Sequence, residues 1–412
     1  MARVVVVGAG VIGLCCAYAL RRRGLEVVVL DGGSPGGGAS LGNGGWICPS
    51  LSGPIPAPGL IATSLRWLAR PDSPFSIRPR LDPRFLRWLW AFRGRCNARD
   101  YRRGLEAVAG LNERTMELFD AMAADGVAFE MHRQGLLFLF RTPAAARAER
   151  RDLLRLERHG QAPARWLDPA ALRAEEPGVS DAVIGGLLAP AERHVRPESL
   201  TRGLLGRLAE LGVPVHGRTT VEGFVRRSGR ICGVRTAAGT YEASHVVLAA
   251  GLRTAELGRL AGIRIPLEAG KGYSVTLATP AVRVTRPLYC AEARVGLSPF
   301  DGALRVLGMM DLSGPDPAIP PRRLATLERA PAGYLRDWGI AGTRQAWAGM
   351  RPLTPDGLPI IGAPTGQDNL IVAAGHAMLG VTLGPATGEA VADVATGTLA
   401  RDRLAAFRPD RF

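Results

Sequence analysis

The chain has 412 residues, with 52 arginines and lysines against 37 acidic residues, a formal net charge of +15 and 47% hydrophobic residues. This length suffices for two domains, and the composition is that of a soluble globular enzyme. Lys271 is the only lysine, so nearly all basic residues are arginines, and they are spread along the chain without a dense basic tail. That distribution argues against a nucleic-acid-binding protein, whereas contact with an anionic membrane surface stays open.

The cysteines and histidines show no pattern of a disulfide framework or a metal site. The six cysteines contain no C-x-x-C pair, and the six histidines have no metal-ligand spacing. This predicts a reducing compartment and no bound metal. The apolar run at 4–20 is followed by no cleavage site, and no other segment approaches the length of a membrane span. We therefore expect a cytoplasmic protein, with attachment to the inner face of the membrane left open.

Residues 4–31 carry the most informative pattern. The sequence VVVVGAGVIGLCCAYALRRRGLEVVVLD predicts a buried parallel strand, a helix and a second strand that ends at Asp31. Gly8, Gly10 and Gly13 stand at G-x-G-x-x-G spacing, which permits a tight turn, approach of a pyrophosphate to the backbone and close helix–sheet packing. The helix N-terminus favours a phosphate, and Asp31 is placed to accept hydrogen bonds from a ribose. The segment predicts a dinucleotide site.

Hydrophobic periodicity further along the chain predicts alternating helices and strands. The proline-rich residues 51–83 are expected to be irregular, and residues 272–310 to form antiparallel strands. Helices are expected at 84–93, 105–125, 143–159, 197–211 and 384–396, and strands at 135–141, 185–188, 213–216, 221–227, 231–236, 241–242, 245–250 and 369–373.

This order predicts a discontinuous nucleotide-binding domain. Its pieces are residues 1–50, 196–262 and 345–412, whereas residues 51–195 and 263–344 form a second domain over the cofactor. Clefts between domains are common sites for small ligands, so we expect the substrate to bind there.

The loop at residues 36–45 favours FAD over NAD. An NAD dehydrogenase usually continues from the first acidic residue into further βαβ units, whereas this chain enters a glycine-rich loop. Its Ser40 and Asn43 are small polar groups suited to a second phosphate and a flat ring. The strand HVVLAAG ends at Gly251 on the same nucleotide, and residues 375–382 lead into a helix whose N-terminus can stabilise a reduced flavin.

Four segments carry a family resemblance: GASLGNGGWICPS, KGYS at 271–274, WAGMRPLTPDGLPIIG at 347–362 and GHAMLGVTLGPATG at 375–388. In this order they resemble the FAD-dependent D-amino acid oxidase family, most of all its bacterial D-amino acid dehydrogenase and glycine oxidase branches. The resemblance covers essentially the whole chain. It implies an α/β protein with a Rossmann-like FAD-binding domain of the glutathione-reductase type and a second, antiparallel-sheet substrate domain.

The activity that the resemblance implies is oxidative deamination of a D-amino acid, glycine or an N-substituted glycine. A hydride passes from Cα to flavin N5, and water hydrolyses the resulting imine to a 2-oxo acid and ammonia. Oxygen or a quinone accepts the electrons, and homo- or hetero-oligomers are both open. The alternative is a flavin-binding electron-relay subunit of a hetero-oligomeric amine-oxidising complex.

The resemblance also implies which residues contact FAD, mostly through their backbone atoms. They are Gly8, Gly10, Val11, Ile12, Gly13, Asp31, Ala39, Ser40, Asn43, Gly44, Gly45, Val221, Ala250, Gly251, Gly349, His376, Met378, Leu379, Gly380, Val381 and Thr382. No cysteine or histidine stands in an attachment motif, so we expect FAD to be bound non-covalently.

Three residues are candidates for the chemistry. Arg351 stands where the glycine oxidase branch carries the arginine that holds the substrate carboxylate, and a guanidinium can bind a carboxylate by two parallel hydrogen bonds. Tyr273 either offers its hydroxyl to that carboxylate or belongs to the core. His376 is better explained as packing on the flavin than as a base, because hydride transfer from a deprotonated amine needs no strong base.

Other side chains are expected near the pocket. Met378 stands where the glycine oxidase branch carries an arginine, which makes this wall more apolar and leaves room for a larger side chain or N-substituent. Trp46, Met309 and Met310 are further candidates for the lining. Lys271 is either retained for its compact ammonium group or left by chance.

Overall fold

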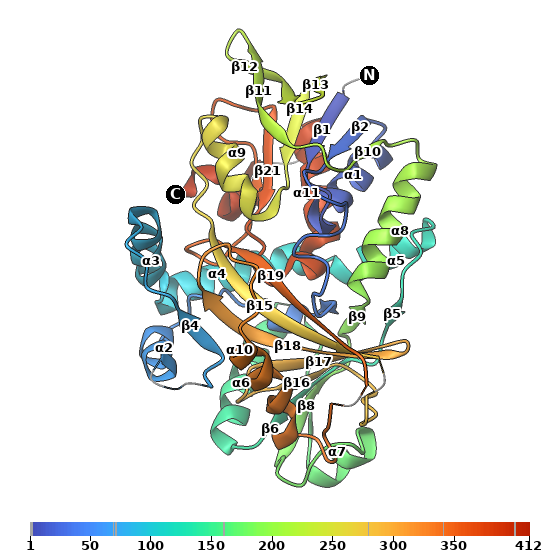
Figure 1. Ribbon diagram of the computed structural model, residues 1–412, viewed down its shortest axis with the longest axis vertical. Coiled ribbons are helices and arrows are strands. Elements are labelled where there is room, and N and C mark those ends of the chain that lie inside the picture. The colour runs from blue at the N-terminus through green and yellow to red at the C-terminus, as the bar shows by residue number, and fades with distance from the viewer. Residues whose placement is uncertain are drawn as a thin grey trace.

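Two sheets organise the computed structural model, which describes residues 3–68, 70, 72–159, 161–278, 280–340, 342–398 and 401–412. A mostly parallel sheet occupies one end of the elongated molecule and a large, mainly antiparallel sheet the other (Figure 1). We call these parts the parallel-sheet domain and the large-sheet domain. The predicted α/β class, with a Rossmann-like unit and a second domain, is confirmed.

The parallel-sheet domain is built on the N-terminal strand. β1 (Arg3–Val7) lies between β2 (Glu26–Leu30) and β14 (His245–Leu248), in the order β10-β2-β1-β14-β21-β20. Only β20 is antiparallel to its neighbour. Alternate valines of β1 pack into two different core clusters, so the sheet is buried on both faces, as its continuous apolar strands predict. The remaining strands are β10 (Val215–His216), β20 (Ile360–Gly362) and β21 (Leu370–Ala374).

Helices cover one face of this sheet. α1 (Val11–Arg22) and α11 (Gly380–Thr396) pack against each other there, with α8 (Pro197–Glu210) beside α1 (Figure 1). Their close approach depends on glycine, because a Cβ atom on Gly388 would stand 2.5 Å from the carbonyl oxygen of Cys15. The other face carries β11 (Val221–Arg227), β12 (Arg230–Thr236), β13 (Gly239–Glu242) and α9 (Thr254–Leu260).

The large sheet is organised around β15 (Glu268–Leu277). This strand pairs along its length with β19 (Arg344–Leu353) on one side and β18 (Ala303–Leu312) on the other. The neighbouring pairs within 272–310 are antiparallel as predicted, whereas β16–β6 and β18–β4 are parallel. The sheet continues through β17 (Val295–Phe300), β16 (Leu288–Cys290), β6 (Leu136–Phe140), β8 (Gly185–Ala189) and β7 (Arg165–Leu167), with β4 (Phe75–Ile77) added at β18.

Further helices pack on both domains, those at residues 98–112 and 115–124 against α11 and the others beside the large sheet. A small sheet joins the two domains. None of the helices within the described residues is long and apolar enough to cross a bilayer. The small sheet consists of β3 (Trp46–Ile47), β9 (Arg193–Val195) and β5 (Met131–His132). The helices are α2 (Leu60–Leu68), α3 (Pro83–Arg95), α4 (Ala98–Asn112), α5 (Thr115–Ala124), α6 (Pro143–Glu157), α7 (Pro169–Glu175) and α10 (Pro321–Arg329).

Three details of the sequence-based prediction are wrong. Residues 51–83 contain α2 and β4; the prolines on both sides of α2 predict an irregular stretch, although Ile61, Leu65 and Leu68 stand at helical spacing within it. The helix predicted at 105–125 is two helices, α4 and α5, because apolar residues continue across the break between them. The boundary predicted at 345 falls within β19, which belongs to the large sheet, so this boundary lies after Leu353.

Candidate active site

The glycines of the N-terminal motif lie where β1 meets α1. Gly8 has a φ of +109°, and a Cβ atom there would stand 2.4 Å from the carbonyl oxygen of Ala249. A Cβ atom on Gly13 would stand 1.8 Å from the carbonyl oxygen of Gly8. At Gly10 the nearest atom to such a Cβ is Ser40 Oγ at 3.4 Å. Close packing thus requires glycine at positions 8 and 13. Gly10 leaves the N-terminus of α1 open to a ligand.

Asp31 and Ser40 hold the backbone around this helix N-terminus. The carboxylate of Asp31, at the end of β2, accepts hydrogen bonds from the amides of Ala9 (2.6 Å) and Gly33 (2.7 Å). Ser40 Oγ accepts a hydrogen bond from the amide of Val11 (2.9 Å). The amides of the first helical turn, Ile12 included, have no partners within the helix. Because Ser40 already binds the Val11 amide, the amides of Ile12 and Gly13 are the ones available to a phosphate.

Three residues expected to contact FAD lie near strand ends at the same edge of the parallel sheet: Val221, Ala250 and Gly251. Val221 begins β11 two residues after Thr219, whose amide donates a hydrogen bond to the Asp31 carbonyl (2.7 Å). Ala250 follows β14, and its Cα lies 2.9 Å from the position of a Cβ on Gly8. Gly251, with a φ of +56°, turns the chain away.

The loop at residues 39–45 connects the parallel-sheet domain to the large sheet. Ala39 is exposed, whereas the backbone carbonyls of Gly42, Asn43 and Gly44 accept three hydrogen bonds from the large sheet. The side chain of Asn43 accepts a further one from the amide of Gly45 (2.8 Å). The three donors from the sheet are, in that order, Ser274 Oγ (2.9 Å), Arg305 Nη1 (2.7 Å) and Ser298 Oγ (2.7 Å).

The turn before α11 reaches the same region. The amide of Ala377, whose φ is +47°, donates a hydrogen bond to the carbonyl of Pro352 (3.1 Å), the residue after Arg351. Thr382 Oγ1 donates to the carbonyl of Trp46 (2.9 Å), so α11 is also tied to the end of the loop. Met378 is 46% exposed, and Leu379, Gly380 and Val381 form the start of the helix.

Arg351 lies on β19 in this junction. Its guanidinium covers Gly272 of β15, where a Cβ atom would stand 2.2 Å from Arg351 Cζ. Nη1 donates a hydrogen bond to the carbonyl of Met309 (2.6 Å), a buried strand residue with a φ of +64°. Met310 Sδ lies 3.8 Å from the same nitrogen. Two residues predicted to line the pocket thus contact the guanidinium, and one of them is held in a costly backbone conformation.

No carboxylate in the described part of the chain lies within 4.0 Å of the Arg351 guanidinium, and the charge of Asp311 acts on it only from farther away. Burial lowers the pKa of Arg351 to about 10, so the group stays charged at neutral pH. Its only hydrogen-bonding partners there are the carbonyl and the sulfur of the two methionines. A buried charge without an ionic partner is unfavourable, so this position is complementary to an anionic group of a ligand.

Trp347 was not among the residues predicted from the sequence. A Cβ atom on Gly349 would stand 1.9 Å from its ring, and one on Gly42 would stand 2.3 Å from it. Because Gly349 pairs with Gly272 beneath the guanidinium, the Trp347 ring and the Arg351 guanidinium are neighbours on one face of the sheet. The sequence does contain a clue to Trp347: side chains alternate between the two faces of a strand, so WAGMR places residues 347, 349 and 351 on the same face.

Tyr273 faces the opposite side of β15 from Arg351. Its hydroxyl donates to Asp311 Oδ2 (2.6 Å), which also pairs with Arg323, and burial raises the pKa of Tyr273. Lys271 lies on the same side and donates from Nζ to the carbonyl of Ala318 (2.9 Å). Tyr273 belongs to the core of the large-sheet domain, and its proposed contact with a substrate carboxylate is corrected accordingly.

His376 is buried in the turn before α11. Its Nε2 lies 2.9 Å from Thr387 Oγ1, and burial lowers the pKa of His376 to about 3. The imidazole is therefore neutral at physiological pH. This environment suits packing better than base catalysis. Trp46, another candidate for the lining, donates from Nε1 to Ser298 Oγ (2.7 Å) and so fixes the loop to the sheet.

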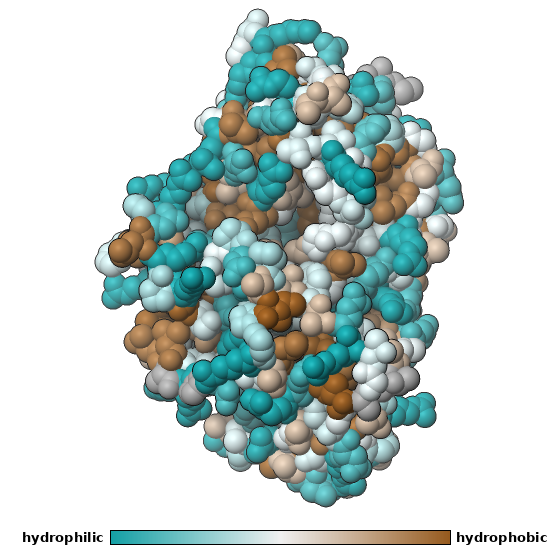
Figure 2. All heavy atoms as spheres, in the orientation of Figure 1, coloured by the Kyte–Doolittle hydropathy of each residue, from teal (hydrophilic) through white to brown (hydrophobic). Residues whose placement is uncertain are grey.

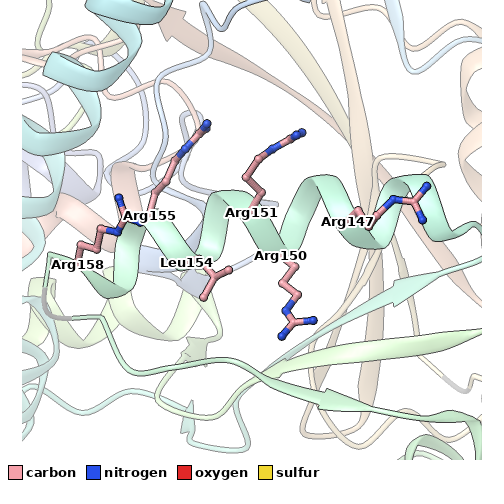
Figure 3. A pocket seen from close by; sticks show the side chains of 6 residues that line it. All are labelled: Arg147, Arg150, Arg151, Leu154, Arg155 and Arg158. Carbon is pink, nitrogen blue, oxygen red and sulfur yellow. The ribbon is translucent and has the colours of Figure 1, made fainter.

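A cavity of about 440 Å³ opens beside Trp347, with Gly42, Arg305 and Glu198 in its wall. It therefore adjoins the junction that contains Arg351. A second hollow, of about 280 Å³, runs along α6 and contains none of the predicted site residues. Its arginines Arg150 and Arg151 point to opposite sides of the helix, so the guanidinium groups do not converge on one ligand (Figure 3). The first cavity also lacks the residues predicted to contact FAD or substrate, but unlike the second it borders the loop at residues 39–45 and Trp347.

One group of side chains within the described residues has metal-ligand geometry. Atoms of Glu130, His132 and Asp301 lie within 4.8 Å of one another. Arg196 stands 3.6 Å from Glu130 and already supplies positive charge there. The group is also partly exposed, so it carries no assignment.

The residues present fit an FAD molecule. Gly10, Gly251 and Gly380 leave space beside their Cα atoms, amides at the N-termini of α1 and α11 lack partners within their helices, and Asp31 supplies an acidic strand end. We call this set of positions, from Asp31 to the α11 turn, the cofactor path. The path ends beside Arg351, where a flat ring system would meet the large sheet, and the Trp347 ring covers Gly349. These positions are brought together from residues 8–45, 221–251 and 349–382.

Comparisons with known proteins agree with this geometry. The family described as FAD dependent oxidoreductase (DAO) matches residues 3–394. A D-amino acid dehydrogenase of Rhizorhabdus wittichii is 34% identical over 416 residues, which cover 97% of this chain and 100% of that protein. L-proline dehydrogenase from P. horikoshii has the same fold over 100% of this chain and 97% of its own, with a TM-score of 0.78 at 21% identity. Glycine oxidase from Geobacillus kaustophilus covers 100% of both chains, with a TM-score of 0.73 at 24% identity. The chain belongs to the FAD-dependent oxidoreductase family DAO, and it is an FAD-dependent oxidoreductase.

Proposed function

We propose that the protein oxidises the Cα–N bond of a D-amino acid, or of glycine or an N-substituted glycine. The observation that carries this proposal is the enclosed guanidinium of Arg351, which stays charged and has no ion pair within the described residues. A substrate carboxylate supplies the missing anion and accepts two parallel hydrogen bonds. The relatives named D-amino acid dehydrogenase, at about a third identity over nearly the whole chain, support this class of substrate.

The side chains around Arg351 bind and orient the substrate in this proposal. Two hydrogen bonds from one planar group fix the direction of Cα as well as the position of the carboxylate. Met309 holds the guanidinium from behind, Gly272 leaves it room, and the Trp347 ring forms the neighbouring wall. The substrate's Cα–H bond and its unprotonated amine then face the end of the cofactor path.

When bound, FAD would supply the redox chemistry as the acceptor of a hydride from Cα. Water would convert the resulting imine to a 2-oxo acid and ammonia, or to glyoxylate and an amine when the substrate is an N-substituted glycine. The amine must lose its proton to the surroundings before the hydride leaves. The described side chains next to Arg351 offer no ionised base, and His376 is neutral and bonded to Thr387. Solvent is therefore the proton acceptor that we propose, and FAD is held without a covalent bond.

The alternative is an electron-relay subunit of a larger amine-oxidising complex. Such a subunit needs the cofactor path but has no use for a carboxylate anchor next to it. The enclosed Arg351 therefore favours an enzyme with its own substrate site. We propose oxygen or a quinone as the electron acceptor, and the reoxidation step of the experiment below distinguishes between them.

Anaerobic reduction of the holoenzyme tests the proposal. The purified protein is mixed without oxygen with D-amino acids, their L-enantiomers, glycine, sarcosine and matched amines that lack a carboxylate. Bleaching of the flavin spectrum by one of the carboxylated amines is expected, and the decarboxylated analogue of that substrate should bleach it far more slowly. Absence of bleaching by every compound overturns the proposal and favours the relay subunit. Reoxidation by air or by a soluble quinone then identifies the acceptor.

A further inference from the structure

Large apolar side chains are exposed mainly on two helices at one edge of the molecule. Among the described residues, twelve large hydrophobic side chains are exposed, and six of them fall within residues 61–90. They produce the hydrophobic areas over α2 and α3 in Figure 2. These six are Ile61, Leu65, Leu68, Leu81, Leu86 and Trp90, with Leu81 99%, Trp90 72% and Leu65 64% exposed.

The sequence of α2 places its apolar residues on a stripe that faces away from the protein. Ile61, Leu65 and Leu68 are spaced four and three residues apart, which puts them on one side of a helix. α2 buries no residue at all, and its contact with the sheet runs through Trp67, whose ring lies 6.5 Å from that of Phe75. The exposed stripe is therefore more apolar than the fold of this helix requires.

α3 is apolar on two opposite sides. Phe85 and Trp88 are buried in a core cluster with the large sheet, which accounts for one side of the helix. Leu86 and Trp90, four residues apart, lie on the other side and are exposed. The loop before α3 adds Leu81 to this outer side. α2 and α3 lie at the same edge of the molecule (Figure 1), so these exposed side chains are found in one region of the surface.

The same surface is strongly basic. Residues 60–95 contain eight arginines and only two acidic residues, Asp72 and Asp82. Asp82 is used as the N-cap of α3, where it accepts a hydrogen bond from the amide of Arg84 (2.9 Å). The side chains of Arg66, Arg84 and Arg87 are exposed, and the described residues offer them no ion-pair partner within 4.0 Å.

We propose that this surface docks on an anionic lipid bilayer. We call it the docking face and define it by Ile61, Leu65, Leu68, Leu81, Leu86 and Trp90 with Arg66, Arg84 and Arg87. Leucine and isoleucine side chains enter the boundary between headgroups and acyl chains, and tryptophan favours that boundary. The arginines are attracted by the net negative charge of an anionic bilayer, which a zwitterionic or cationic surface lacks. α3 packs through Phe85 and Trp88 against Leu353 and Met310 near Arg351, whereas the docking face lies on its outer side. The proposal does not depend on the proposed catalytic function.

Vesicle sedimentation tests this proposal without reference to catalysis. FAD-saturated protein is spun with phosphatidylcholine vesicles that contain either no phosphatidylglycerol or 30 mol% of it (an anionic fraction of roughly a third gives the surface potential that polybasic segments detect). Binding to the anionic vesicles alone is expected, and it should weaken as salt rises. Substituting Leu65→Ser with Leu81→Ser should lower the partition coefficient by at least ~tenfold. Arg84→Gln with Arg87→Gln should lower it by a similar factor.

Matched controls separate docking from general changes in the surface. Leu154→Ser with Leu260→Ser removes two exposed leucines elsewhere, and Arg259→Gln with Arg264→Gln removes two exposed arginines of the parallel-sheet domain. Both controls should bind like the parent protein, and the flavin spectrum verifies that every variant is folded. Failure of the parent protein to bind anionic vesicles overturns the proposal. Equal binding by the docking-face variants overturns it as well. A parent oligomer that Leu65→Ser with Leu81→Ser converts to monomers, without vesicle binding, shows instead that this face joins two copies of the chain.

Discussion

Met309 presents its backbone carbonyl to Arg351 Nη1 at 2.6 Å while its own φ is +64°. A non-glycine residue in this region stores strain, which the surrounding strand pairs must compensate. The register between β15 and β18 shifts next to Met309, so the strain coincides with an irregularity of the sheet. Sheet geometry and side-chain chemistry together thus hold the guanidinium with its remaining N–H groups free for a carboxylate.

Arg351→Ala is expected to raise KM for the substrate. Loss of a charge-assisted contact costs about 1.5–3 kcal/mol, which corresponds to a ~10–150-fold increase in KM. Arg351→Lys should give an intermediate KM, because an ammonium keeps the charge without the two-pronged geometry. Steady-state kinetics with the substrate found by flavin bleaching measures both variants. Arg344→Ala, on the exposed end of the same strand, is the matched control. A KM equal to that of the parent protein removes the assignment.

Gly272→Ala should weaken substrate binding although residue 272 itself contacts no substrate. The added Cβ atom would stand 2.2 Å from Arg351 Cζ and must displace the guanidinium. A KM increase of ~tenfold or more is expected, because a misplaced guanidinium loses one or both charge-assisted hydrogen bonds. The flavin content should stay at the parent level. Gly206→Ala on α8 introduces the same methyl group into open space and serves as the control. Unchanged kinetics of Gly272→Ala would mean that the guanidinium is not confined by β15.

Local patterns determined which parts of this fold could be predicted. The G-x-G-x-x-G turn, the first two strands and Asp31 follow from residues close together in sequence. The hydrogen bond from Arg351 to Met309 joins residues 42 positions apart and depends on the register of two long strands, which no local pattern specifies. Tyr273 shows the same limit, because a single position along β15 decides whether a side chain faces Arg351 or the core.

Asp31→Ala is expected to reduce FAD affinity. The carboxylate accepts hydrogen bonds from the Ala9 and Gly33 amides and so shapes the turn into α1, besides its proposed contact with the ribose. Loss of one charged hydrogen bond costs about 1.5–3 kcal/mol, so Kd for FAD should rise ~10–150-fold. Titration of apoprotein with FAD, followed by quenching of flavin fluorescence, measures this. Asp31→Asn keeps an acceptor oxygen, so its Kd for FAD should lie between those of the parent protein and Asp31→Ala. Equal affinity in all three proteins would place the ribose elsewhere.

Glu192 makes stability depend on pH. Its Oε1 accepts a hydrogen bond from the Ser50 amide (3.0 Å), and burial raises the pKa of Glu192 from 4.5 to about 8. The folded state thus binds a proton that the unfolded state releases between pH 4.5 and pH 8. Stability from this group is complete below pH 4.5 and is lost as the pH rises through 8.

Glu192→Gln tests this directly because it keeps the shape without the ionisation. The free energy of unfolding is measured in urea at pH 5 and at pH 8. Its decrease between these two pH values should be larger in the parent protein than in the variant, by ~2–4 kcal/mol. His376→Gln provides a comparison of opposite sign, since the pKa of about 3 for His376 destabilises the fold only below pH 6.5. Parallel pH profiles for Glu192→Gln and the parent protein would show that Glu192 ionises in the folded state as freely as in water.

The packing of α1 against α11 joins the first and last parts of the chain in one domain. β20, β21 and α11 lie beyond residue 359. During synthesis, β14 therefore stays an unpaired edge of the parallel sheet until β21 has left the ribosome. Domains generally fold during synthesis once their sequence is complete, and this one is complete only near the C-terminus. We therefore expect flavin capture only after α11 has been synthesised, and chains cut short before residue 360 should accumulate without cofactor and be prone to aggregation.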